Sequence, residues 1–253
     1  MKVAAYQAPL LPAGSTTRAL RLIRRQIDHC ETAGVEMLCC PEGVLGGLAD
    51  YATDPASFAL DAERQLREVL EPLTSDRVTT IVGFTEVDRR GRLYNAAVVW
   101  HKGSVAGLYR KLHPAINKSV YEPGCDTPVF TVGGLTFGIV ICRDSVFAEP
   151  ASRMAAQGAA VLFVPTNNGM PVEKGGRELV GEARNVDIER ATENGTSVVR
   201  ADVAGRQGEL VSFGSSGIVD GAGTILASSR PLEADLLVAE VAVAPRRMIL
   251  GNH

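Results

Sequence analysis

The sequence predicts one mixed α/β domain over residues 1–253. Three observations lead to this prediction. Hydrophobic residues make up 45% of the chain and charged residues 22%, which is typical of a folded globular protein. Short apolar segments with the character of buried strands alternate with segments of helical periodicity. No linker-like stretch, internal repeat or low-complexity run divides the chain, so a single domain is the economical interpretation.

The first half of the chain predicts a strand–helix–strand unit followed by antiparallel strands. Leu20, Ile23 and Ile27 recur at helical spacing, and Gly34 behind them is a typical helix end. The tetrapeptide DRRG at 88–91 is a typical hairpin turn. We expect strands at residues 3–7, 37–40, 78–87, 95–100 and 105–109, and helices at residues 16–33 and 62–70.

The second half predicts a hairpin and then further alternation of strand and helix. The hairpin turns at Gly133 and Gly134. Pro150 is compatible with the first turn of a helix, and Gly158 is suited to end that helix. We expect strands at residues 130–132, 135–141, 160–164, 196–200, 213–219, 224–227 and 236–241, and helices at residues 147–157 and 177–193.

Charge and hydropathy argue against several classes of partner. The chain has 26 basic and 29 acidic residues and a formal net charge of −3, so no broad cationic field attracts nucleic acid or an anionic membrane. No apolar run approaches the ~20 residues that span a bilayer, and the N-terminus lacks a secretory apolar region. We therefore expect a cytoplasmic protein without a nucleic-acid or membrane partner.

The five cysteines do not predict a disulfide framework or a zinc site. Their number is odd in a chain without a secretion signal, and neither CxxC pairs nor clustered histidines provide zinc-ligand spacing. At least one thiol is therefore a candidate for chemistry rather than for cross-linking.

Three chemically capable side chains follow apolar strands directly: Glu42 after MLCCP, Lys111 after VAGLYR and Cys142 after LTFGIVI. Ligand sites in α/β sheets gather at the carboxyl ends of strands. A nucleophilic cysteine titrates at about 8.5 when unperturbed and needs a base or a cation beside it, which Glu42 and Lys111 could supply. Each residue alone is more often a buried thiol, a loop carboxylate or a surface lysine, so spacing alone leaves the site open.

The motifs PEG, YRKLHP and ICRD, in this order, resemble those of the carbon-nitrogen hydrolase (nitrilase) superfamily. The resemblance extends over nearly the whole chain through VAAYQAP, NAAVVW, VPTNN and EARNVDIERATENGTSVVRAD. It implies a four-layer αββα sandwich, a homodimer, and a Glu-Lys-Cys triad in which Glu42 is the general base, Lys111 the cation and Cys142 the nucleophile.

The resemblance also implies a reaction that needs no metal and no cofactor. Glu42 would deprotonate Cys142, and Lys111 with the backbone N–H of Arg143 would stabilise the oxyanion. The expected substrate is a small linear amide, which would pass through a thioester, release ammonia and be freed by water. A nitrile or an N-carbamoyl amide handled by the same triad is the alternative. A non-catalytic binding or regulatory module on the same fold is the alternative of another class.

The sequence departs from the family pattern in two places. Many members carry a second glutamate in the loop before the cysteine, where this chain has Asn117 or Ser119. Glu122 is the only carboxylate in that loop and is therefore the candidate for this role. Ser145 and Val146 also stand where some branches place an arginine that binds a substrate carboxylate. A carboxylate-bearing substrate is thus less favoured.

Three further residues are candidates for supporting roles. His113 precedes a proline behind the lysine strand, where the family keeps a histidine for local hydrogen bonding. Tyr51 in the GGLADY loop and Asn167 in the VPTNN turn are candidates for the wall of the substrate pocket.

Overall fold

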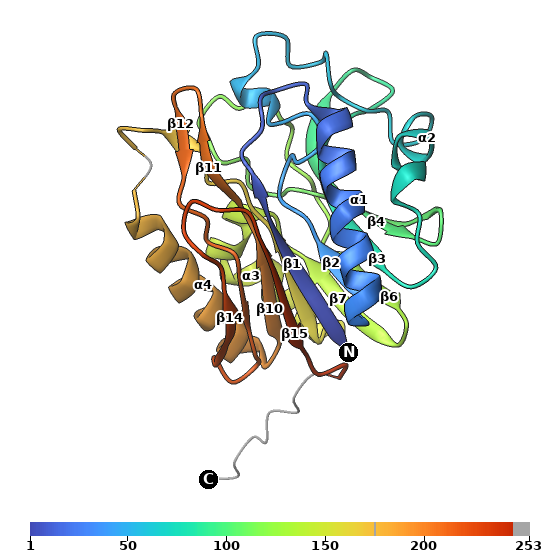
Figure 1. The fold of residues 1–253 in the computed structure, drawn as a ribbon, viewed down its shortest axis with the longest axis vertical. Helices are drawn as coiled ribbons and strands as arrows, with labels where there is room; N and C mark the ends of the chain where they lie inside the picture. The colour runs from blue at the N-terminus through green and yellow to red at the C-terminus, as the bar shows by residue number, and fades with distance from the viewer. Residues whose placement is uncertain (175, 245–253) are drawn as a thin grey trace.

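The computed structural model describes residues 1–174 and 176–244, and its two β-sheets pack face to face (Figure 1). Within the described residues one sheet has nine strands in the order β5-β4-β3-β2-β1-β11-β12-β9, with β15 also paired to β1. The other has six strands in the order β14-β13-β10-β8-β7-β6. A mixed α/β fold with two sheets and flanking helices is therefore confirmed.

The larger sheet consists of β1 (Lys2–Pro9), β2 (Met37–Cys39), β3 (Thr79–Val87), β4 (Leu93–His101), β5 (Ser104–Arg110), β9 (Met170–Pro171), β11 (Val203–Gln207), β12 (Leu210–Ser212) and β15 (Asp235–Glu240). The smaller sheet consists of β6 (Val129–Val132), β7 (Leu135–Ile139), β8 (Val161–Pro165), β10 (Ser197–Ala201), β13 (Gly217–Val219) and β14 (Ile225–Ser228). The α-helices are α1 (Thr16–Ala33), α2 (Leu66–Leu70), α3 (Ala148–Ala156) and α4 (Glu178–Asn194). Short 3-10 turns lie at η1 (Ala49–Tyr51), η2 (Glu71–Leu73) and η3 (Cys142–Val146).

The alternation of side chains along β1 explains the four layers. Val3 and Ala5 belong to the core between the two sheets, whereas Ala4 and Tyr6 point to the opposite face. On that opposite face they share a second core with the apolar stripe of α1. Helices α3 and α4 pack on the smaller sheet, on the other side of the molecule from α1 (Figure 1). The predicted αββα sandwich is confirmed.

The topology brings several strand ends to one edge. Strands β1, β2 and β3 are parallel neighbours. Strand β4 runs antiparallel to β3 and β5 antiparallel to β4, so β5 points the same way as β2 and β3. In the smaller sheet β7, β8 and β10 are parallel neighbours. Residues that follow β2 and β5 therefore leave the larger sheet at the same edge.

Several element boundaries differ from the sequence prediction. The helix predicted at 62–70 begins only at Leu66, because the Asp61 carboxylate accepts hydrogen bonds from the backbone of Glu63 and Arg64 and holds the preceding segment in turns. Strands β9, β11 and β12 were not predicted, since their segments lack an apolar period. The strand predicted at 213–219 begins at Gly217, after Gly214 turns the chain with a φ of 81°. Among the described helices, none combines the length and apolar character needed to cross a bilayer.

Candidate active site

The three residues expected to carry chemistry come together. Glu42 follows β2, Lys111 follows β5 and Cys142 follows β7, and all three line one cavity of about 430 Å³. Two come from the larger sheet and one from the smaller sheet, so the cavity depends on the packing of both sheets. Asn167 and Arg143, also singled out in the sequence, line the same cavity.

Glu42 and Lys111 form a buried ion pair. Each side chain is 2% exposed, and the Lys111 Nζ lies 2.6 Å from the Glu42 Oε1. The Asn95 amide donates to the same oxygen at 2.7 Å, and the backbone N–H of Asn167 donates to Oε2 at 3.0 Å. Burial alone disfavours the ammonium, but attraction by Glu42 and Cys142 outweighs burial and raises the pKa of Lys111. Lys111 is therefore a fixed positive charge in the cavity wall.

The turn that carries Glu42 packs tightly against β3. A Cβ added at Gly83 would lie 2.7 Å from the Gly43 nitrogen and 2.8 Å from the Glu42 Cα, distances that real side chains do not tolerate. Only glycine leaves room for this contact. The Glu42 backbone nitrogen also donates to the Thr166 carbonyl at 3.3 Å, which ties the turn to the smaller sheet.

Cys142 has a strained backbone. Its φ of 46° is in the left-handed region, which costs a non-glycine residue about 1–2 kcal/mol. The Ser145 hydroxyl donates to the Cys142 carbonyl at 2.7 Å, and the Arg200 guanidinium donates to the Ser145 hydroxyl at 3.0 Å. Arg200 is in turn held by Asp187, 2.6 Å away. This chain of contacts fixes the turn that presents the thiol.

The Cys142 thiol is neutral at rest. Burial, reinforced by the nearby Glu42 carboxylate, raises the pKa of Cys142 to about 12, although Lys111 and Arg200 oppose the shift. A thiol in this state needs a base to become a nucleophile. Glu42 lines the same cavity, paired with Lys111, and its carboxylate acts on the Cys142 thiol, so Glu42 is the candidate base.

Asp144, two residues beyond the cysteine, joins the lysine strand to the nucleophile turn. Its buried carboxylate accepts hydrogen bonds from the Tyr109 hydroxyl at 2.7 Å and from the His113 backbone at 2.8 Å. The His113 ring lies 3.0 Å from the same carboxylate and stacks on Phe147 at 4.0 Å. His113 is not among the residues that line the cavity. The structure therefore places His113 in a local hydrogen-bonding position behind the site.

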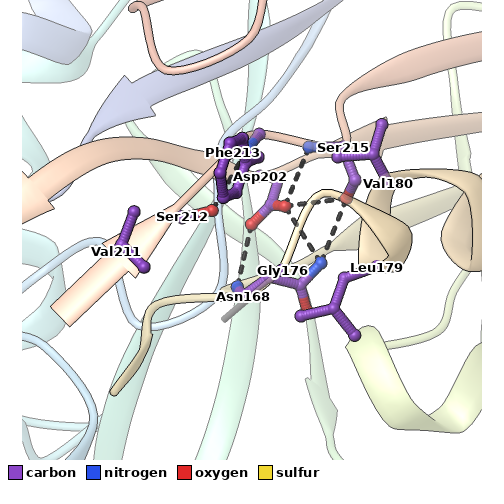
Figure 2. Close-up of a pocket in the computed structure, with 10 residues that line it drawn as sticks. Asn168, Gly176, Leu179, Val180, Asp202, Val211, Ser212, Phe213 and Ser215 are labelled. Carbon is purple, nitrogen blue, oxygen red and sulfur yellow. Dashed lines mark hydrogen bonds between the residues drawn. The ribbon is translucent and has the colours of Figure 1, made fainter. Parts of the chain in front are cut away.

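Another buried carboxylate, that of Asp202, anchors the loop after β8 (Figure 2). It accepts from the Asn168 backbone and side chain at 3.0 and 3.1 Å, and from the Ser215 hydroxyl at 2.7 Å. The adjacent void of about 10 Å³ has room for no more than about one water molecule. By holding Asn168, Asp202 fixes the neighbouring Asn167 N–H that bonds Glu42.

The other three candidates from the sequence are Glu122, Arg143 and Tyr51. Glu122 is exposed, its backbone N–H donates to the Leu93 carbonyl at 2.8 Å, and it is not among the residues that line the cavity. Arg143 is exposed, with its guanidinium donating to the Ala115 carbonyl at 3.3 Å. The side chain of Tyr51 lies outside the described part of the chain.

Sequence reasoning missed Asn95, Arg200, Asp187 and Asp50. Asn95 and Arg200 interrupt otherwise apolar strands, and a buried polar residue in such a position is a signal that could have identified them. Asp187 and Asp50 carry no comparable signal. Within the described residues no group of three or more His, Cys, Asp or Glu side chains is arranged to hold a metal ion.

Comparison with known proteins agrees with this fold and site. The carbon-nitrogen hydrolase family model matches residues 2–247. A glutamine-dependent NAD(+) synthetase from Xanthomonas campestris is 33% identical over 242 residues, which cover 92% of this chain and 42% of that protein. The chain thus spans less than half the length of that relative.

Two solved structures are also similar. One is a glutamate-to-glutamine mutant of the amidase from Nesterenkonia sp. AN1, in which acrylamide has been added to the active-site cysteine. It is 26% identical to this chain, and the two superpose with a TM-score of 0.80 over 96% of this chain and 93% of the amidase. The other, a carbon-nitrogen hydrolase from Helicobacter pylori G27, shares the fold with a TM-score of 0.84 at 22% identity, over 95% of this chain and 88% of that one.

The fold and the site together are those of a hydrolase with an active-site cysteine. The fold is a two-sheet α/β sandwich, and the cavity is lined by a cysteine and a buried Glu-Lys pair. With the family match over almost its whole length, the chain belongs to the carbon-nitrogen hydrolase family of the nitrilase superfamily.

Proposed function

We propose that this protein hydrolyses a small linear amide through a thioester on Cys142 and releases ammonia. The observation that carries the proposal is the buried Glu42–Lys111 ion pair in the wall of the cavity that Cys142 also lines. The similarity to an amidase whose active-site cysteine accepted acrylamide supports an amide as the substrate.

The first half of the reaction forms the acyl-enzyme. Glu42 takes the Cys142 proton, and the sulfur attacks the amide carbon as the carbonyl electron pair moves to oxygen. Lys111 and the backbone N–H of Arg143 stabilise that oxyanion, and each such donor can lower the barrier by about 3–4 kcal/mol. The C–N bond then breaks, protonated Glu42 gives its proton to the leaving nitrogen, and ammonia departs.

The second half frees the product. Glu42 takes a proton from water, and the oxygen attacks the thioester carbon to form a second oxyanion at the same donors. The C–S bond breaks, the thiolate recovers a proton from Glu42, and a carboxylic acid leaves. Both halves use Glu42 alternately as base and acid, and its three hydrogen-bond donors hold the carboxylate in one position for both steps.

A nitrile and an N-carbamoyl amide remain as alternative substrates for the same residues. Measuring ammonia and carbon dioxide release over a panel of amides, nitriles and carbamoyl compounds separates the three, because only the carbamoyl reaction releases carbon dioxide. Ammonia from nitriles with none from amides would replace the amide proposal with nitrile hydrolysis.

The thioester is tested by intact-protein mass spectrometry after brief incubation with the panel. We expect wild type quenched early in the reaction to carry an acyl adduct that maps to Cys142, and Cys142→Ala to form none. Glu42→Gln lacks the base that both halves use, so its adduct should form slowly and, once formed, should persist. Absence of adducts from both wild type and Glu42→Gln, with Cys142 no more reactive toward a thiol-selective electrophile than the exposed Cys125, would favour a binding or regulatory module instead.

We also propose that the protein is a homodimer, as the family resemblance implies. Light scattering at micromolar concentration is expected to give twice the monomer mass of 26.8 kDa. A particle of monomer mass alone would contradict this.

A further inference from the structure

Asp50 contributes a carboxylate to the same cavity without taking part in the reaction described above. It lies in the short η1 turn, within the GGLADY loop that begins at Gly46. The Ser119 hydroxyl contacts its two oxygens at 2.9 and 3.0 Å, and the Val120 backbone N–H donates to one of them at 2.8 Å. A carboxylate offers about four acceptor positions, so these two donors leave acceptor capacity for a ligand.

The turn that carries Asp50 is fixed from a second side. The backbone N–H of Ala49 donates to the Tyr121 hydroxyl at 2.6 Å, and that hydroxyl also contacts the Thr85 hydroxyl at 2.8 Å. Burial raises the pKa of Tyr121 to about 12, and the carboxylates of Glu42 and Asp50 both add to the shift. The hydrogen bonds from Ala49 on one side of Asp50 and from Val120 on the other hold the η1 turn against the segment around Tyr121.

Among the residues that the structure describes, no side chain compensates the charge of Asp50. Lys111 is compensated by Glu42 and Arg200 by Asp187, each at 2.6 Å. Arg143 and Glu182, the other charged residues in the cavity wall, are exposed and of opposite sign. Across the described residues no cation lies within ion-pair distance of Asp50, whose contacts above are all neutral donors. One negative charge is therefore available to a ligand.

The cavity is larger than a simple amide needs and has apolar walls. Its volume of about 430 Å³ equals the liquid volume of about fourteen water molecules. The larger aliphatic residues in its wall are Leu48, Ile116, Val146, Met170, Leu179 and Val186. Walls of this kind accommodate a methylene chain between the reacting carbonyl and a charged end.

We propose that Asp50 binds a cationic group of the substrate, so that the protein prefers primary amides whose methylene chain ends in an ammonium group. This inference rests on the proposed amide hydrolysis. The ammonium would form a charge-assisted hydrogen bond with a carboxylate that is already oriented, which makes Asp50 a specificity-determining residue.

The test compares two amides of equal length and shape, 5-aminopentanamide and hexanamide, which differ by an ammonium in place of a methyl group. We expect wild-type kcat/KM to be at least tenfold higher for the aminoamide. Asp50→Asn keeps the side-chain shape and an oxygen acceptor but removes the charge, and should lower the ratio of the two kcat/KM values at least tenfold. Ser119→Ala, which releases one hold on the carboxylate, should lower the ratio by a smaller factor.

Asp54→Asn is the matched control, because it removes a negative charge from an exposed position of the same loop that does not line the cavity. It should leave the ratio unchanged. A wild-type ratio near one, or an Asp50→Asn protein that loses activity equally on both amides, would overturn the inference; the second result would make Asp50 a positioning residue for the amide itself. If wild type hydrolyses neither these amides nor any other amide, the proposed function fails instead.

Discussion

The two ends of the cavity differ in how firmly their side chains are held. At the inner end Glu42, Lys111 and Arg200 are at most 3% exposed, and each makes at least one charged contact within 2.6 Å. At the mouth Val146 is 60% exposed and Arg143 has a single side-chain hydrogen bond, at 3.3 Å. A reacting group must be held to within a fraction of an ångström, whereas a wall that selects substrates can vary without unfolding the protein. Mutations at the inner end should therefore affect stability and rate together, and those at the mouth should affect binding alone.

The largest effect is expected from Arg200→Met. Arg200 is 3% exposed and donates to Asp187, to the Thr166 hydroxyl at 2.8 Å and to the Ser145 hydroxyl at 3.0 Å. Removing it leaves the buried Asp187 carboxylate with only its longer ion pair to Arg184, at 3.5 Å, and loss of one partner of a buried pair costs about 3–5 kcal/mol. Urea denaturation should show a decrease of that size in the free energy of unfolding.

The double variant Arg200→Met, Asp187→Leu is the control for that measurement. It removes both charges, so the penalty for the buried carboxylate disappears. Arg184 loses its 3.5 Å ion pair with Asp187 but keeps its hydrogen bond to the Ser216 carbonyl at 3.0 Å, so much of the stability should return. Hydrolysis should stay impaired, because Ser145 would still lack the donor that holds the Cys142 turn. Recovery of activity along with stability would show that Arg200 is needed for folding only.

The next largest effect is expected from Gly83→Ala. The added methyl group would meet the Gly43 nitrogen and the Glu42 Cα within 2.8 Å, so the base must move. A displacement of about 1 Å costs about 100-fold in rate, and kcat/KM should fall by about that factor. Gly181→Ala is the control: it lies within α4 with open space around it, and should raise stability by about 1 kcal/mol without loss of activity. Equal kcat/KM values for the two variants would contradict the tight fit around Glu42.

How much of this site could be predicted follows from where its residues lie. Glu42, Lys111 and Cys142 follow apolar strands and lie within recognisable motifs, so both their position and their candidate roles were readable from the sequence. Helix α1 was predicted at its observed bounds, because its apolar stripe and Gly34 act locally. These features depend on neighbours along the chain.

The residues that were missed depend on partners far away in sequence. Ser119 contacts Asp50 across 69 positions, and nothing in either local sequence announces the contact. Glu122 was the candidate for the second glutamate because it is the only carboxylate in the loop HPAINKSVYEPG. In the structure, a hydrogen bond from its backbone N–H to the Leu93 carbonyl holds it at an exposed position. Sequence alone could not show that a carboxylate reaches the cavity from another loop.

A smaller effect on the rate of hydrolysis is expected from Asp202→Asn. Asparagine would bring an N–H group against the donors of Asn168 and Ser215, loosen the loop and weaken the Asn167 N–H bond to Glu42. We expect kcat to fall about tenfold with little change in KM, roughly the effect of one weakened hydrogen bond to a charged group.

The same variant should change how stability depends on pH. Burial raises the pKa of Asp202 despite the opposing hydrogen bonds from Asn168 and Ser215. A carboxyl whose pKa is raised by folding stabilises the protein below its unfolded pKa of about 3.9, and this contribution is lost as pH rises through the folded pKa. The stability of wild type relative to Asp202→Asn should therefore decline in urea titrations as the pH rises from about 4 through the raised folded pKa of Asp202. A relative stability that rises with pH would contradict this sign.

The smallest effect is expected at the mouth, from Val146→Ala. Val146 lines the cavity while 60% exposed, so its two methyl groups contribute little to folding but are available to an apolar substrate chain. The free energy of unfolding should change by less than about 0.5 kcal/mol, as for other exposed positions. Loss of about one methylene's worth of burial, about 0.8 kcal/mol, should raise KM for hexanamide about fourfold. Val146→Ala should thus weaken substrate binding while leaving stability nearly unchanged, whereas Arg200→Met should lower the stability of the protein. If Val146→Ala instead lowered stability by several kcal/mol, the mouth would be as tightly integrated as the inner end, and the distinction between the two ends of the cavity would be wrong.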